Sequence, residues 1–364
     1  MWQTDINHQE LLVVGAPHPY SRRHLAELER LAADEPDAAL RALYAFLAEW
    51  FDSSSTVQVQ TSGSTGTPKR LRVEKQRMMA SACRTLQALH LEPGQTALLS
   101  MNLRYIGAKM MVVRALVGAL RLRVVPPSSH PLAAGGADFL SMVPLQLYHT
   151  LQVRSERERL AAARVVLVGG GAVEASICRQ VDVLPCKVYS TYGMTETLSH
   201  VALARLVAGS DGLLHYTPLP GVDVELSPRG TLVVRAPFVC DAPLETNDLA
   251  QLYPNGTFSI LGRADNTVCS GGIKIQIEED ERVLATVLQH SFALTWVQHP
   301  SLGQALVLMV AATCTLPDAA LLQLARQVLP RYHVPRRVVR VPALPLTPNG
   351  KVDRAACHRL AADV

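Results

Sequence analysis

A short segment rich in glycine and hydroxyl side chains is the first sign of chemistry in this sequence. The segment "TSGSTGTPKR" occupies residues 61–70 and directly follows the strand-like "TVQVQ". Glycines allow backbone N–H groups to turn toward an anion, and hydroxyl and lysine side chains add further donors. The segment therefore predicts a phosphate-binding loop. The residues expected to hold the phosphates are Thr61, Ser62, Gly63, Ser64, Thr65, Gly66 and Lys69.

This loop does not fit the Walker A motif of P-loop NTPases. That motif requires a glycine, then four residues, then Gly-Lys-Ser/Thr. Counting from Gly63 puts Pro68 where the second glycine is required, and Arg70 where the Mg²⁺-binding hydroxyl is required. The sequence thus favours phosphate binding without P-loop NTPase chemistry.

A second segment, "YSTYGMTET" at residues 189–197, offers groups that suit a nucleotide and a metal ion. Tyr192 supplies a flat aromatic face for a base, Thr195 supplies a hydroxyl, and Glu196 supplies the hard oxygen ligand that Mg²⁺ prefers. Taken alone, the segment also fits an ordinary strand end.

Two further segments carry charged side chains in turn-rich surroundings. In "TNDLAQLYPNGTFSILGRAD", Asp248 can accept hydrogen bonds from both ribose hydroxyls, and Arg263 can contact the sugar or a phosphate. In "PLTPNGKVDR", a Pro/Asn/Gly turn places Lys351 on an exposed tip. Each of these residues alone also fits a surface ion pair or a solvated lysine.

The segments that must position these residues predict an α/β fold. Apolar runs at 97–102, 122–127 and 164–173 are typical of buried strands, and the apolar stretch 105–120 is typical of a buried helix between the first two. Such alternation predicts βαβ units with a parallel sheet.

The second part of the chain has a different pattern. Shorter, turn-bounded strands at 230–239 and 256–265 predict a β-rich subdomain. A strand at 305–312 and helices at 278–290 and 318–329 then predict a separate α+β unit. We therefore expect a large N-terminal domain over 1–264 and a small, mobile C-terminal domain over 265–364.

Composition excludes several other classes of protein. The 364 residues include 35 basic and 31 acidic side chains, a balance that argues against nucleic-acid binding. The seven cysteines form no CxxC pair, so we expect neither disulfides nor a zinc site, and we predict a cytoplasmic protein. The longest apolar region, 97–125, is interrupted by arginines and a lysine, which predicts no membrane insertion.

Taken together and in this order, the four motifs resemble those of the adenylate-forming superfamily, which includes acyl-CoA synthetases, peptide-synthetase adenylation domains and luciferases. "TSGSTGTPK" is similar to its phosphate loop and "YGMTE" to its adenine and Mg²⁺ motif. "ND" followed by "GRAD" is similar to its ribose motif and hinge, and "PLTPNGK" to its catalytic-lysine motif. The resemblance runs from about residue 55 to the end, and it implies that the N-terminal subdomain is shortened. Asn247, Ile277 and Asp280 differ from the residues that the family prefers.

The resemblance implies a two-step reaction that uses ATP, Mg²⁺ and coenzyme A. A carboxylate attacks the α-phosphate of ATP, and a thiol then attacks the acyl-adenylate. Lys351 would bridge the acyl carboxylate and the phosphate, and rotation about Asp265 would bring Gly271 and Gly272 to the pantetheine arm of CoA. The implied catalytic residues are Lys351, Thr195 and Glu196, with Glu196 as the metal ligand. The implied ATP-binding residues outside the phosphate loop are Gly169, Gly170, Gly171, Tyr192, Gly193, Asp248 and Arg263.

Two segments point to a substrate class. "LRYIGAKMMVVRALV" and "DFLSMVPLQLYHTL" resemble o-succinylbenzoate–CoA ligases of menaquinone biosynthesis. The resemblance would place Arg104, Tyr105, Gly107 and Lys109 in the acyl pocket, where a cation suits an aromatic diacid. The alternatives are an enzyme that activates another aryl or amino acid for CoA or a carrier protein, and a catalytically silent nucleotide-binding protein. A homodimer is also compatible with the sequence.

Overall fold

The computed structural model describes residues 2–60, 70–171, 173, 175–207, 213–347 and 352–363. The chain divides into two compact units. The first unit comprises Met1–Gly209, Leu214–Val224 and Val234–Leu244, and the second comprises Ser210–Leu213, Glu225–Val233 and Glu245–Val364.

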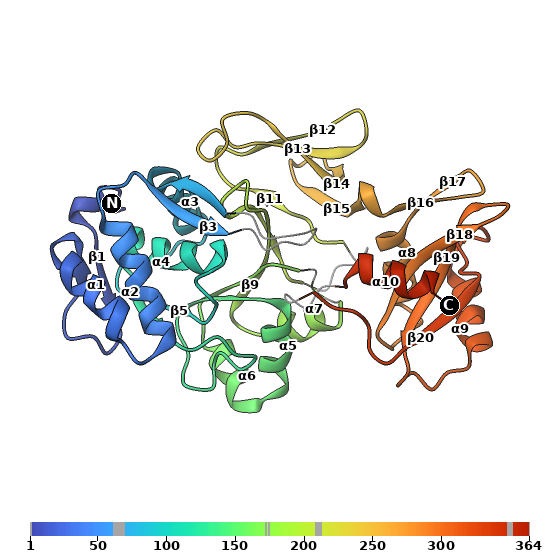
Figure 1. Cartoon of the computed structure of the whole chain (residues 1–364), viewed down its shortest axis with the longest axis horizontal. Helices are drawn as coiled ribbons and strands as arrows, with labels where there is room; N and C mark the ends of the chain where they lie inside the picture. The colour runs from blue at the N-terminus through green and yellow to red at the C-terminus, as the bar shows by residue number, and fades with distance from the viewer. Residues whose placement is uncertain are drawn as a thin grey trace. The chain divides into compact units, whose positions relative to one another are not determined.

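Among the described residues, a nine-stranded sheet with the order β11-β10-β9-β8-β7-β5-β6-β1-β2 forms the centre of the first unit (Figure 1). The strands from β9 to β1 in this order pair in parallel, and β2, β10 and β11 pair antiparallel at the edges. The predicted α/β fold is thereby confirmed. The strands are β1 (Glu10–Val13), β2 (Tyr20–Ser21), β5 (Thr96–Leu99), β6 (Arg121–Val124), β7 (Phe139–Met142), β8 (Val165–Val168), β9 (Lys187–Gly193), β10 (His200–Arg205) and β11 (Thr217–Pro218).

Helices connect and cover these strands. Helix α4 is buried on nearly every face from Ala108 to Gly118, as its mostly apolar sequence predicts, and it ends where Ala119 adopts a left-handed conformation. Helix α2 begins at an Asp37 cap whose carboxylate accepts two backbone N–H groups. The helices are α1 (Leu25–Asp34), α2 (Ala38–Phe51), α3 (Lys75–Ala88), α4 (Ile106–Gly118), α5 (Pro144–Gln152), α6 (Arg154–Ala161) and α7 (Ala175–Asp182).

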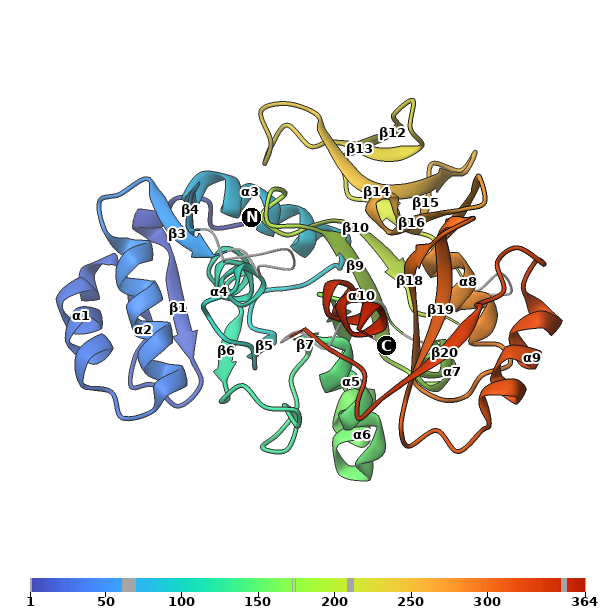
Figure 2. The ribbon, with the colours of Figure 1, turned by 45° about the vertical axis from the view of Figure 1, so that its right-hand side comes forward.

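A separate two-stranded hairpin, β3 (Thr56–Gln60) and β4 (Arg70–Glu74), lies beside α3 and α4 (Figures 1 and 2). Its strands pair from Thr56 opposite Glu74 to Gln60 opposite Arg70. The hairpin therefore flanks the predicted phosphate loop on both sides.

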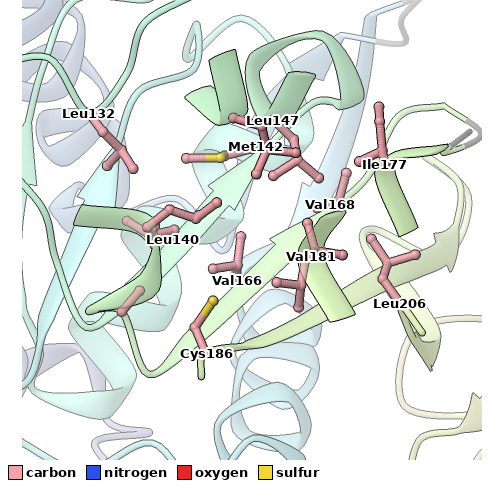
Figure 3. Packing of buried hydrophobic residues seen from close by; sticks show 14 of the residues in the cluster. Leu132, Leu140, Met142, Leu147, Val166, Val168, Ile177, Val181, Cys186 and Leu206 are labelled. Atoms are coloured by element: carbon pink, nitrogen blue, oxygen red, sulfur yellow. The ribbon is translucent and has the colours of Figure 1, made fainter. Parts of the chain in front are cut away.

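Helices α5 and α7 pack on one face of β7 and β8. All four residues of β8 are buried, as expected for a parallel strand with helices on both sides. Leu140, Val166 and Val168 pack against Leu147 and Ile177 from the covering helices (Figure 3). Burial of each such side chain stabilises the fold by about 1.5–3 kcal/mol.

The rest of the chain is richer in antiparallel strands. Within the described ranges, one sheet has the order β12-β13-β14-β15, and another has the order β17-β16-β19-β18 with β20 pairing to β19. The strands are β12 (Asp223–Leu226), β13 (Thr231–Arg235), β14 (Leu244–Leu252), β15 (Phe258–Arg263), β16 (Thr267–Ser270), β17 (Ile273–Gln276), β18 (Phe292–His299), β19 (Gly303–Ala311) and β20 (Arg337–Val341).

Three helices of the second unit pack on its five-stranded sheet: α8 (Ile277–Leu284), α9 (Asp318–Val328) and α10 (Arg354–Ala362). The predicted helix over 278–290 is too long, because α8 ends at Leu284. Just beyond this end, the backbone N–H groups of Thr286 and Val287 donate to carbonyls three residues earlier, at 3.1 and 3.0 Å, which is the pattern of a tighter turn. Over the described ranges, every helix is too short or too polar to traverse a lipid bilayer.

An ion pair ties α10 to α8 and predicts a measurable stability contribution. Arg354 donates to both carboxylate oxygens of Glu281, at 2.6 and 2.5 Å, and to the Leu294 carbonyl at 3.0 Å. The two side chains are 27% and 18% exposed. We expect Arg354→Met to lower the free energy of unfolding by about 2 kcal/mol, because Glu281 would remain largely buried without its cation. Urea denaturation measures this loss.

The control for this experiment is Arg154→Met. Arg154 also pairs with a glutamate, but its side chain is 93% exposed. Its loss should change the unfolding free energy by less than about 0.5 kcal/mol. Equal effects of the two substitutions would contradict the assigned contribution of Arg354.

Candidate active site

The carboxyl ends of β8 and β9 lie side by side and carry the first group of predicted site residues. Val168 of β8 is in register with Ser190 of β9. A Cβ on Gly169 would lie 2.5 Å from the Thr191 hydroxyl oxygen, and Gly170 has a φ of +85°. The turn therefore favours glycine at position 170, and a side chain at position 169 would displace the Thr191 hydroxyl. In open parallel sheets, ligands bind at this end of the strands.

Tyr192 is held next to a second aromatic ring. It is 9% exposed, and its ring centroid lies 5.7 Å from that of Tyr216, at an interplanar angle of 58°. The Tyr216 hydroxyl forms a 2.9 Å hydrogen bond with the Ser190 hydroxyl, and burial raises the pKa of Tyr216. The position of Tyr192 is thus fixed by packing, and its contact with adenine stays a prediction.

The turn between β9 and β10 presents Thr195 and Glu196. Inside this turn, the buried Thr197 hydroxyl accepts the Met194 N–H at 3.0 Å and donates to the Ser199 carbonyl at 2.7 Å. The Cys240 thiol donates to the backbone carbonyl of Glu196 at 3.3 Å. The backbone of the turn is therefore fixed while the Glu196 side chain remains exposed.

Gly193 is required for the same turn. A Cβ at this position would overlap the Ser199 carbonyl oxygen and the His200 Cα, both of which are backbone atoms. A side chain could be accommodated only by moving the turn. Gly193 therefore sets the path of the chain into Thr195 and Glu196.

A buried polar network behind this turn was missed by the sequence reasoning. Arg114 of α4 donates to the Ser199 hydroxyl at 2.6 Å, and the same nitrogen lies 3.5 Å from His200 Nδ1. His200 Nε2 lies 3.0 Å from the Thr85 hydroxyl. The sequence signal for this network is a single arginine inside the apolar run "MMVVRALV".

Arg114 is a buried cation whose charge is not neutralised by the described residues. It is 2% exposed, and within the described ranges neither a carboxylate pairs with it nor a hydrogen-bond acceptor meets its Nε. Burial lowers the pKa of Arg114 to about 9. Burial, followed by the neighbouring Arg114, lowers the pKa of His200 well below its usual value, so His200 is neutral at pH 7.

The second unit brings Asp248 and Arg263 together, and their role at the ribose stays a prediction. They are opposite each other in β14 and β15, with 3.5 Å between Arg263 Nη1 and Asp248 Oδ1. Arg263 also donates to both oxygens of Asp265, at 2.9 and 2.8 Å. This hydrogen bonding is the main cause of the lowered pKa of Asp265 and the raised pKa of Arg263.

Gly271 and Gly272 form the two-residue turn between β16 and β17. Their φ angles are +58° and +84°. Positive φ at both central residues is the requirement of a type I′ hairpin turn, which explains why both positions are glycine. Their contact with CoA stays a prediction.

The predicted acyl-pocket residues occupy the start of α4. Arg104 and Tyr105 are exposed, and Gly107 is half-buried. Lys109 is 9% exposed, and its ammonium group already contacts a carboxylate of α2 and a carbonyl of β3. A substrate carboxylate would have to compete with these partners, so the geometry favours Arg104 over Lys109 as the cation for the acid.

The phosphate-loop residues at 61–69 and the catalytic-lysine candidate Lys351 lie outside the described residues. Their assigned roles stay predictions. The strands that flank the loop are described, and so is the bridge between Leu346 and Val352 that flanks Lys351.

One group elsewhere has the composition of a metal site. His18, His24 and Glu27 place ligand atoms within 4.8 Å of one another. However, His24 Nδ1 accepts the Ser21 N–H at 3.2 Å, so Nε2 carries the proton in the neutral ring and does not coordinate. Nitrogen ligands are also a poor match for Mg²⁺, and the Mg²⁺ prediction rests on Glu196.

Comparison with known proteins identifies the relatives of this chain. The AMP-binding enzyme family model matches residues 11–235, and the AMP-binding enzyme C-terminal domain model matches residues 291–351. A 2-succinylbenzoate–CoA ligase of Salmonella typhimurium is 29% identical over 331 residues, which are 86% of this chain and 71% of that enzyme.

Solved structures agree in fold. An acyl-CoA synthetase (AMP-forming)/AMP-acid ligase II-like protein of Dyadobacter fermentans matches with a TM-score of 0.60 and 32% identity, over 90% of this chain and 96% of that one. The Bacillus subtilis o-succinylbenzoate coenzyme A synthetase in complex with ATP and magnesium matches with a TM-score of 0.69 and 20% identity, over 82% of this chain and 68% of that one.

The lowered pKa of His200 predicts a pH dependence of stability. Below about pH 6.5 the unfolded chain takes up a proton at this histidine and the native protein does not, so the free energy of unfolding falls as the pH falls. His200→Gln removes this component. Below pH 6.5, the unfolding free energy of the wild type should therefore fall relative to that of His200→Gln. The relative fall should be up to about 1.4 kcal/mol per pH unit. Urea denaturation between pH 7 and pH 5 measures this change.

His290→Gln, which replaces an exposed histidine, is the control for this pH series. The unfolding free energy of His290→Gln should vary with pH in the same way as that of the wild type. If the His200→Gln curve runs parallel to that of the wild type across the range, the assigned pKa direction is wrong.

Proposed function

Because this chain belongs to the AMP-binding enzyme family, we propose that it activates a carboxylic acid with ATP and Mg²⁺ and transfers the acyl group to coenzyme A. A carboxylate oxygen attacks the α-phosphorus and pyrophosphate leaves. The CoA sulfur then attacks the acyl carbonyl carbon and AMP leaves. We propose o-succinylbenzoate as the acid, supported by the resemblance to the Salmonella ligase over most of both chains.

The first step requires positioning and charge stabilisation rather than proton removal, because a carboxylate is already ionised. Gly169, Gly170, Gly171, Tyr192 and Gly193 would bind the adenine side of ATP. The Thr195 hydroxyl would contact the α-phosphate. Glu196 presents an exposed carboxylate on a fixed backbone. This is a suitable ligand for Mg²⁺, which would neutralise phosphate charge when bound.

The second unit would contribute the ribose contacts and the catalytic lysine. Asp248 would accept the ribose hydroxyls, with Arg263 beside it. Lys351 would bridge the acyl carboxylate and the phosphate. Asp265 would serve as the hinge that exchanges Lys351 for Gly271 and Gly272 in the thiol-transfer step.

The observation that most favours a diacid substrate is that Arg114 is buried and has no carboxylate partner among the described residues. A buried guanidinium without a carboxylate partner is costly. A second carboxylate on the acid would supply the missing partner, and the ring carboxylate of o-succinylbenzoate is such a group. Arg104, exposed near the start of the same helix, would assist in attracting the diacid.

The direct test incubates the protein with ATP, Mg²⁺, CoA and o-succinylbenzoate. We expect AMP, pyrophosphate and the CoA thioester in equal amounts, quantified by liquid chromatography. The matched comparison is 4-oxo-4-phenylbutanoate, which lacks only the ring carboxylate and should be a much poorer substrate. A panel of aryl and amino acids with a carrier protein in place of CoA tests the alternative acceptor.

Each other outcome selects a different function. Preference for a mono-acid would refute the diacid proposal. Acid-dependent pyrophosphate release with thioester formed only on a carrier protein would identify a carrier-loading enzyme. If no acid supports pyrophosphate release, the chain is a nucleotide-binding protein without ligase activity.

Arg114→Met tests the role of the buried guanidinium. Truncating one partner of a buried charge pair costs about 2–5 kcal/mol, so we expect KM for o-succinylbenzoate to rise at least about thirtyfold. KM for ATP and KM for 4-oxo-4-phenylbutanoate should change little. Equal increases for both acids would show that Arg114 does not contact the ring carboxylate. Arg104→Ala is measured in parallel, and an unchanged KM for the diacid would remove Arg104 from the pocket.

A further inference from the structure

Strand β3 is held on its outer edge by an ion pair from two helices. The backbone N–H of Gln58 donates to Glu49 Oε1 at 2.5 Å, and the Gln58 carbonyl accepts from Lys109 Nζ at 2.5 Å. Lys109 Nζ also lies 3.4 Å from Glu49 Oε2. One residue of β3 thus has both of its backbone groups bound by a Glu–Lys pair contributed by α2 and α4.

These contacts cover the edge of β3 that does not pair with β4. In an antiparallel pair, alternate residues direct both backbone groups away from the partner strand. Gln58 is such a residue, since its groups bond to side chains outside the hairpin. Two residues earlier, Thr56 exchanges hydrogen bonds with the Ser54 hydroxyl at 3.1 and 3.0 Å. Two residues later, Gln60 bridges to Tyr105, directly before α4.

A two-stranded hairpin is marginally stable by itself, so it depends on contacts of this kind. Lys109 is almost fully buried, and its ammonium lies 4.9 Å from the centre of the Phe46 ring. Hydrogen bonds that involve charged groups are stronger than neutral ones, and poor solvent access strengthens them further. The Glu49–Lys109 pair therefore fixes the position and direction of β3 relative to α2 and α4.

We infer that Glu49 and Lys109 are positioning residues for nucleotide binding, which act by holding the strand that leads into the phosphate-loop motif. Gln58 precedes Thr61, the first residue of that motif, by three positions. This inference rests on the proposed use of ATP. It gives Lys109 a role different from the acid contact that the family resemblance implies.

The test measures MgATP binding by calorimetry without any acid, so it does not depend on which acid is the substrate. Lys109→Met should weaken MgATP binding about tenfold, well within the loss that a misplacement of about 1 Å can cause. KM for the acid should stay within about twofold of the wild type. Arg23→Met, which breaks an exposed ion pair with Glu10 in the same unit, is the matched control and should change neither value.

Glu49→Gln keeps the fold testable if Lys109→Met does not fold. The amide oxygen can still accept the Gln58 N–H while the charge on Lys109 loses its partner, so we expect weakening of about two- to threefold. A raised KM for the acid with unchanged MgATP binding in Lys109→Met would overturn the inference in favour of direct acid binding. A lower active fraction with both affinities unchanged would overturn it in favour of a purely structural role.

Hydrogen exchange of the Gln58 amide separates this inference from the proposed function. Protection of this amide should fall in Glu49→Met relative to the wild type, whether or not nucleotide binds. If the wild type binds no MgATP, the proposed function fails, and the exchange result alone decides whether the ion pair holds β3. Unchanged protection in Glu49→Met would overturn the inference.

Discussion

The close parallel pairing of β8 and β9 is the constraint on which the candidate active site depends. At the carboxyl ends of these strands, a Cβ on Gly169 would displace the Thr191 hydroxyl. The chain then turns back at Gly193, where a Cβ would overlap backbone atoms. Together these contacts determine where Tyr192, Thr195 and Glu196 can lie. The chemistry assigned to them requires fixed positions, because positioning supplies most of the catalysis in adenylate formation.

The buried cations of the first unit differ in whether a described carboxylate pairs with them. Lys75 at the start of α3 is paired with Asp52 at 2.7 Å, and Lys109 is paired with Glu49. Both connect the helices to the base or edge of the β3–β4 hairpin. Arg114 alone of these three is without a carboxylate among the described residues. The two lysine charges are thus compensated by carboxylates of the same unit, and the partner proposed for Arg114 is a carboxylate of the substrate.

Much of the fold and of the candidate site could be predicted from sequence because the relevant signals are local. The apolar stretch at 105–120 matches α4 within two residues at each end, and the run at 164–173 contains β8. Asp248 and Arg263 belong to one motif, and the hairpin β14–β15 places them opposite each other. In each case the signal and the contact lie in one short segment or one hairpin.

The residues that sequence missed depend on contacts between distant segments. Arg114 contacts Ser199 across 85 positions, and Lys109 contacts Gln58 across 51 positions. No local periodicity specifies such pairs. For the same reason the motif alone places Lys109 in the acyl pocket, whereas in the structure its ammonium contacts Glu49 and the Gln58 carbonyl. The end of α8 differs from the prediction because the apolar pattern continues past Leu284, whereas the backbone hydrogen bonds change there to three-residue turns.

Arg263 links the two roles predicted for the second unit. Its guanidinium binds Asp265 through two short hydrogen bonds and lies 3.5 Å from Asp248 through a third nitrogen. If Asp265 is the hinge, a change in its backbone dihedrals moves its carboxylate and so alters the orientation of Arg263. The contact between Arg263 and Asp248 would then change with the conformation of the hinge, and the proposed ribose contact would change with it. A single guanidinium between two carboxylates would thus couple the proposed ribose contact to the proposed rotation about Asp265.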